Sequence, residues 1–153
     1  MNILRNAAII GALSVLTFAG ASAIAAEDPI ATRQAIMSSV GAAAGLGGGM
    51  MKGDVAYSPA AGKSAIATMR AASLTFGDFF PEGSDQGKTG AAAKIWEDPD
   101  GFKAELAKFA GATEKAMAAS GKDGPADLEA FKAAFGPVLG SCKSCHETYR
   151  KKN

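Results

Sequence analysis

The sequence predicts an all-α protein, an antiparallel four-helix bundle. After residue 27, apolar residues recur every three or four positions over four segments, which is the period of an amphipathic helix. Each segment begins beside a proline, and glycine or proline marks most of the ends. Strict alternation of apolar and polar residues, the pattern of a strand, persists in no segment of this part. Four such helices with mostly short connections pack as an antiparallel bundle.

Residues 1–25 have the pattern of a secretory signal peptide. A positively charged start precedes an uncharged apolar run, and Ala23-Ile24-Ala25 offers the small-x-small pattern of a cleavage site. The apolar run is too short to span a bilayer and remain there, although an uncleaved anchor is the alternative. We expect cleavage near Ala25 or Ala26, which leaves residues 26–153 as one periplasmic domain without a membrane attachment.

The first helix is predicted to begin at Asp28-Pro29, where aspartate caps the helix and proline takes its first position. It extends to Met51 or Lys52. Its glycine-rich part, residues 41–51, is costly, because each interior glycine costs about 1 kcal/mol relative to alanine. We therefore expect another group to approach this backbone closely.

The second and third helices are predicted to begin at Ser58-Pro59 and Asp98-Pro99 and to end at Pro81 and Gly121. The long connection between them, residues 81–97, is expected to have a role such as lining a site. The residues expected on one face are Ile66, Met69, Ser73, Phe76 and Phe80 in the second helix and Phe102, Leu106, Phe109, Thr113 and Met117 in the third.

The fourth helix is predicted to begin at Gly124-Pro125 and to run to the end of the chain. Gly136-Pro137 inside it is expected to kink the helix without ending it, because the apolar pattern continues in register. That pattern consists of Leu128, Phe131, Phe135, Val138, Leu139, Cys142, Cys145, His146 and Tyr149.

The charge balance argues against a nucleic-acid partner. Without Arg5 the chain has 15 basic and 15 acidic residues, whereas nucleic-acid binding requires a positive surface. The run Arg150-Lys151-Lys152 is a local positive patch, for which a solvated helix end is the simpler interpretation.

The two cysteines and the single histidine fall within five positions, Cys142 to His146. A redox dithiol requires a low thiol pKa, usually at a helix N-terminus, but this pair lies in the last turns of a helix. Zinc would require a fourth ligand, and the chain has no further cysteine or histidine. The C-x-x-C-H spacing predicts covalent attachment of haem c, with Cys142 and Cys145 on one helical face and His146 as the proximal iron ligand.

The position of this motif on the last of four helices resembles the class II cytochromes c, the cytochrome c′ and cytochrome c-556 family. The resemblance covers essentially the whole chain after the signal peptide. It implies a four-helix bundle with one haem c attached to the C-terminal helix. The segments that carry it are RQAIM (33–37), KGDVAYSPA (52–60), KIWED (94–98) and CKSCHETYR (142–150).

The resemblance implies that the residue four positions after Arg33, which is Met37, faces the distal side of the haem. A methionine ligand raises the reduction potential and favours electron transfer, as in the c-556 type. The c′ type leaves the iron five-coordinate, so that NO or CO can bind. Packing of Met37 in the core without ligation is the alternative, since it lies on an apolar stripe.

Other haem contacts follow from the same resemblance. Arg33 suits a propionate carboxylate, Gln34 touches the haem or its propionates, and Arg150 lies beside the proximal imidazole. A solvated helix end is the alternative for either arginine. Tyr149 is expected to pack on the proximal side and Trp96 to pack in the core beside the haem.

The expected function is single-electron transfer with periplasmic redox proteins, by a carrier that is not an enzyme. The alternative is a protein that binds or scavenges NO or CO on an open distal face. A homodimer through the first two helices is usual for the c′ type, and the glycine-rich face would permit it.

Overall fold

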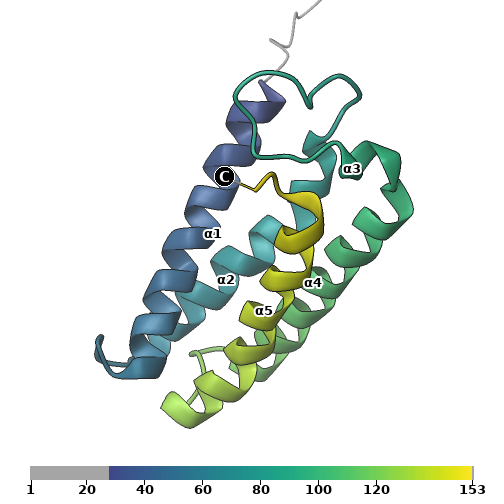
Figure 1. Cartoon of the computed structure of the whole chain (residues 1–153). Coiled ribbons are helices and arrows are strands. Elements are labelled where there is room, and N and C mark those ends of the chain that lie inside the picture. Colours follow the sequence, from purple (N-terminus) through teal and green to yellow (C-terminus); the bar gives the residue numbers. More distant parts are fainter. Residues whose placement is uncertain (1–27, 153) are drawn as a thin grey trace, which may run out of the picture.

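The computed structural model describes residues 28–152, and its elements form the predicted all-α bundle (Figure 1). The signal-peptide prediction for residues 1–25, with its cleavage site, lies outside the described residues. The elements are α1 (Pro29–Lys52), α2 (Pro59–Thr75), the 3₁₀ turn η1 (Phe76–Phe79), the short α3 (Lys94–Glu97), α4 (Pro99–Ser120) and α5 (Leu128–Tyr149). None of these helices combines the length and apolar character needed to cross a membrane.

Side-chain caps explain where three of the helices begin. Asp28 accepts a hydrogen bond from the backbone N–H of Ile30 at 2.9 Å, and Ser58 and Asp98 cap α2 and α4 in the same way. The predicted starts of these three helices are confirmed. α1 ends before Gly53, whose φ of 87° lies in the left-handed region that favours glycine.

The end of the second helix was predicted wrongly. The α-helix stops at Thr75, and η1 continues to Phe79, two residues before Pro81. Helices often end in a short 3₁₀ turn, and the apolar residues before Pro81 did not distinguish such a turn from an α-helical one.

The start of the last helix also differs from the prediction. Gly124 lies in the turn before α5, with φ 105°, and packs against the backbone of Pro59. The cap is Asp127, whose carboxylate accepts a hydrogen bond from the N–H of Ala130 at 2.8 Å. α5 then runs through Pro137 without ending, as predicted, and the kink expected there stays a prediction.

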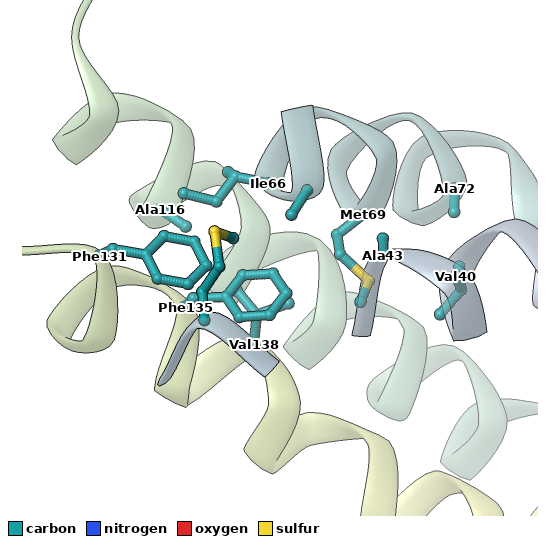
Figure 2. Packing of buried hydrophobic residues seen from close by; sticks show 11 residues of the cluster. Val40, Ala43, Ile66, Met69, Ala72, Ala116, Phe131, Phe135 and Val138 are labelled. Atoms are coloured by element: carbon teal, nitrogen blue, oxygen red, sulfur yellow. The ribbon is translucent and has the colours of Figure 1, made fainter. Parts of the chain in front are cut away.

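The main core lies in the middle of the bundle and at the end where α5 begins (Figure 2). Phe131 and Phe135 stack with ring centroids 5.0 Å apart and point toward side chains of α1 and α2. The Phe135 ring also fills the space beside Gly47, where an added Cβ would lie 2.1 Å from the ring. The close approach expected for the glycine-rich stretch is therefore present at Gly47, and its partner is a phenylalanine.

A second core cluster closes the opposite end of the bundle. Its buried members are Ala91, Ile95, Phe102 and Tyr149, with Phe80, Trp96, Leu106 and Cys145 packed against them. The long connection between η1 and α4 crosses this end, where α1 begins and α5 ends (Figure 1). Cys145 of the C-x-x-C motif thus packs against this cluster, to which the long connection contributes Ala91 and Ile95.

Candidate cofactor-attachment site

Both cysteines lie in the last turns of α5, half-buried and outside any disulfide. Burial raises the pKa of the Cys142 thiol. Burial, reinforced by the negative charge of Glu105 and by Cys142, raises the pKa of Cys145 to about 11. Both thiols are therefore protonated at neutral pH, which argues against a redox dithiol that works through a thiolate.

His146 follows directly and faces a hollow of about 390 Å³ on the surface of the bundle. Partial burial of the ring and the positive charge of Arg150 lower the pKa of this histidine. The imidazole is thus neutral at neutral pH, which is the form that coordinates a metal. Two thiols three residues apart, followed by a neutral and accessible imidazole, fit a haem attached through its two vinyl groups.

Glu105 of α4, which was not among the residues predicted from the sequence, holds the turn of α5 that carries the two cysteines. Ser144, between the two cysteines, donates a hydrogen bond to Glu105 Oε2 at 2.6 Å, and Lys108 donates to Oε1 at 2.5 Å. These two hydrogen bonds, that of Lys108 first, lower the pKa of Glu105. A carboxylate between Phe102 and Phe109 on one helical face was the available signal.

Tyr149 closes the last turn of α5 against the start of α4. Its side chain is buried, its hydroxyl donates to Asp98 Oδ2 at 3.1 Å, and its ring packs edge-on against Phe102 at 5.3 Å. Trp96 lies nearby in the same cluster and packs against Phe80. The contacts of both residues with a haem stay predictions.

Arg33 is buried, with 4% of its surface exposed, so the alternative of a solvated helix end is wrong for this residue. Its guanidinium donates to the carbonyl of Phe79 at 2.7 Å, to Ser84 Oγ at 2.8 Å and Ser84 O at 2.7 Å, and to Thr89 Oγ1 at 3.2 Å. It also lies over the Phe80 ring at 4.7 Å. The structure thus gives Arg33 a partner set in the long connection, and its contact with a propionate stays a prediction.

Residues 80–92 of this connection form a strap, a segment that joins the start of α1 to the end of α5. Besides Arg33, Gln34 of α1 holds it by donating from Nε2 to the carbonyl of Lys88 at 2.8 Å. At the other side, the Ala92 N–H donates to Tyr149 O at 3.0 Å, and the Lys151 N–H donates to Gly90 O at 2.8 Å. The strap therefore lies at the end of the bundle that holds the C-x-x-C-H motif.

Met37 lies one turn after Arg33 on α1, half-buried and packed against the main core. The contact between α1 and α5 is less extensive than the contact between α4 and α5. An added Cβ at Gly41 or Gly45 would meet no protein atom within 4 Å, so this side of α1 offers open space near Met37. Ligation of iron by Met37 stays a prediction.

Arg150 ends α5 and is exposed, and its backbone pairs with Ala91 of the strap in an isolated β-bridge. Its side chain borders the same hollow as His146, close enough to lower the pKa of that imidazole. The structure thus brings Cys142, Cys145, His146 and Arg150 together at the end of α5.

Comparison with known proteins agrees with this arrangement. The family model described as Cytochrome C′ matches residues 28–150. A cytochrome c-556 of Agrobacterium tumefaciens is 35% identical over 78% of this chain and 94% of that protein. A cytochrome c′ of Rhodopseudomonas palustris is 37% identical over 97% of both chains.

A solved structure gives the same result for the fold. The nitric oxide complex of a variant of cytochrome c prime from Alcaligenes xylosoxidans is 32% identical, with a TM-score of 0.70, and the match covers 82% of this chain and 96% of that chain. The protein belongs to the cytochrome c′ family of class II c-type cytochromes. Its cofactor is one covalently attached haem c, and its role is electron transfer or gas binding.

Proposed function

We propose that this protein is a periplasmic electron carrier of the c-556 type. Cys142 and Cys145 attach the haem through thioether bonds, His146 is the proximal ligand, and Met37 is the sixth ligand. The observation that carries the haem attachment is the end of α5, where two half-buried cysteines three residues apart precede an exposed imidazole. Ligation by Met37 is supported by its position on α1, half-buried and one turn after the buried Arg33. The bound haem supplies an iron that changes its charge by one electron.

The surroundings of the motif support a role in electron transfer. Ser144 and Glu105 hold the attachment turn against α4, and the strap packs over the same end of the bundle. A firmly held site needs little rearrangement when the charge of the iron changes. Methionine ligation on the opposite side would favour the reduced state and would leave no open coordination position.

Export to the periplasm is part of the proposal. It rests on the signal-peptide pattern of residues 1–25 and on the attachment of haem c, which takes place outside the cytoplasm. A fusion of this segment to a reporter enzyme that is active only after export tests it. Full activity would support export, and retention of the fusion in the cytoplasm would contradict it.

Spectroscopy of the haem-loaded ferric protein tests the sixth ligand. We expect low-spin iron in the EPR spectrum and a methionine–iron charge-transfer band, both lost in Met37→Leu, which keeps the volume of the side chain. Met51→Leu is the matched control, because Met51 also lies on α1 and packs against the main core. A high-spin spectrum that Met37→Leu leaves unchanged would contradict ligation by Met37.

A second function, binding of NO or CO, is favoured by one observation of the structure. A Cβ added at Gly41 or Gly45 would meet no protein atom within 4 Å, which leaves space on this side of α1. A variant of the Alcaligenes relative has been solved as a nitric oxide complex. In that case the ferrous protein would bind NO or CO at a rate that Met37→Leu does not change. Binding that becomes much faster in Met37→Leu would show that methionine normally occupies the position.

A further inference from the structure

The surface around His146 carries an excess of positive charge. The hollow beside it is bordered by Lys143, Arg150, Lys151 and Lys152, which we call the cationic rim, and, among residues 28–152, by one carboxylate, Glu147. All four cationic residues are exposed. Glu147 lies 3.6 Å from Lys143 and offsets that charge in part. In the part of the chain that the structure describes, Arg150, Lys151 and Lys152 therefore outnumber the carboxylates on the hollow.

This excess is local, because the charge of the whole chain is nearly balanced. The formal net charge is +1, and without Arg5 the basic and acidic residues are equal in number, 15 of each. Of the nearby carboxylates, Glu105 is paired with Lys108 and bound by Ser144. Asp85 accepts a hydrogen bond from the neutral amide of Gln86 and keeps its charge, so Glu147 and Asp85 offset part of the four positive charges of the rim. The rim therefore carries a local excess of positive charge, although the whole chain is nearly neutral.

The rim is also held in place, unlike a frayed helix end. The backbone of Arg150 pairs with Ala91 of the strap, and the N–H of Lys151 donates to Gly90 O at 2.8 Å. The side chain of Lys151 reaches the carbonyl of Asp85 at 3.4 Å, which leaves its charge intact. The backbone that carries Arg150 and Lys151 is thus fixed by hydrogen bonds to the strap, whereas the backbone of a frayed helix end would have no such partners.

We propose that the cationic rim is the docking surface for an acidic patch on the redox protein that exchanges one electron with this cytochrome. The proposal rests on the proposed function. Clustered lysine and arginine side chains beside the cofactor attract a carboxylate-rich surface from a distance and orient it toward the haem. This attraction acts mainly on the rate of association, and added salt screens it.

Small oxidants of opposite charge test the local field without a natural partner. In the haem-loaded, reduced protein, one electron passes to ferricyanide, an anion, or to tris(phenanthroline)cobalt(III), a cation. Ionic strength is raised from about 0.01 M to about 0.15 M, which shortens the Debye length from about 30 Å to about 8 Å. We expect the rate with the anion to fall roughly tenfold and the rate with the cation to rise. Two flat responses, as expected for an evenly neutral surface, would overturn the proposal.

Paired variants separate the rim from the total charge. Lys151→Glu/Lys152→Glu reverses two rim charges beyond the end of α5, so the helices are undisturbed. Lys115→Glu/Lys122→Glu changes the net charge equally, at exposed positions near the other end of α4. We expect only the rim variant to lose the salt dependence with ferricyanide. An equal loss in both variants would show that net charge alone is responsible.

A binding measurement provides a readout that is independent of electron transfer. The oxidised protein is applied to immobilised poly-glutamate and to vesicles that contain an anionic phospholipid. We expect the wild type and the control to elute from poly-glutamate at similar salt concentrations and the rim variant to elute much earlier. Stronger retention on the vesicles than on poly-glutamate would replace the proposal with a membrane surface. The two proposals can also fail separately. If the protein has high-spin iron but still binds poly-glutamate through the rim, the rim remains an acceptor of acidic surfaces and the electron carrier of the c-556 type is rejected.

Discussion

Ser144 and Glu105 join the haem-attachment turn of α5 to α4 through a hydrogen bond of 2.6 Å, although they lie 39 residues apart in the sequence. Glu105 also binds Lys108, and the glutamate side chain is 12% exposed. The charged carboxylate thus connects a helix of the scaffold to the segment between the two cysteines.

Glu105→Gln should lower the free energy of unfolding at neutral pH. The loss should be about 1 kcal/mol, because the partner Lys108 is 62% exposed and solvent screens the ion pair. Lys108 and Ser144 lower the pKa of Glu105 below its ordinary value of 4.5, so the folded state binds fewer protons than the unfolded state. The stabilisation is therefore present above about pH 4.5 and is lost as the pH falls through the folded pKa.

Denaturant unfolding of both proteins over a range of pH measures this difference. Glu114→Gln is the control, because its carboxylate is 72% exposed and lies 3.8 Å from Arg70. A difference between wild type and Glu105→Gln that stays constant into the acid range would contradict the assignment.

Arg33→Lys should loosen the strap. Lysine keeps the charge but cannot reach the Ser84 and Thr89 oxygens together as the planar guanidinium does. We expect hydrogen exchange at the Ala92 and Lys151 amides, which bond across the strap, to become at least several-fold faster. Each hydrogen bond lost from a charged donor corresponds to about 1.5–3 kcal/mol.

Arg70→Lys provides the comparison, because Arg70 is half-buried and donates to the carbonyl of Ala110 at 3.0 Å. It should leave exchange in the strap unchanged. Wild-type exchange in Arg33→Lys would mean that Arg33 does not hold the strap.

Gly47→Ala should be strongly destabilising. Its new methyl group would lie 2.1 Å from the Phe135 ring, and overpacking of this kind costs about 1–3 kcal/mol or more. Gly111→Ala in α4 meets no atom within 4 Å and should stabilise by up to about 1 kcal/mol through helix propensity. Thermal unfolding should therefore shift in opposite directions, and the double variant Gly47→Ala/Phe135→Leu should recover part of the loss. Two shifts of the same sign would refute the contact.

Tyr149→Phe should change how stability responds to alkaline pH. Burial, together with the hydrogen bond and charge of Asp98, raises the pKa of Tyr149 above 10.0. The folded state therefore keeps its proton where the unfolded state loses it, so the contribution is complete below pH 10.0 and falls as the pH rises further. The variant should be less stable at neutral pH and should decline less steeply above pH 10.0. Parallel stability curves for the two proteins would exclude this role.

The features that were predictable from the sequence depend on neighbouring residues. Asp28, Ser58 and Asp98 cap their helices through atoms two or three residues away, and the C-x-x-C-H motif places its groups within two helical turns. The start of the last helix was missed because Gly124-Pro125 has the composition of a helix start, while the nearby Asp127 provides the actual cap.

The remaining features depend on pairs that are distant along the chain. Arg33 and Ser84 are 51 residues apart, and no periodic pattern relates a buried arginine to a serine in an irregular connection. Glu105 appeared only as a charged residue on an otherwise apolar face. Its partner became identifiable once the packing of α5 on α4 was known.

The strap has a consequence for the order in which the protein is assembled. Its hydrogen bonds to Arg33 and Gln34 use residues that are synthesised before the strap, whereas those to Tyr149 and Lys151 use residues that are synthesised more than 50 positions after it. A nascent polypeptide that stops short of Tyr149 has no partner for Ala92. The end of the bundle that carries both thiols can therefore close only after Tyr149 and Lys151 have been synthesised.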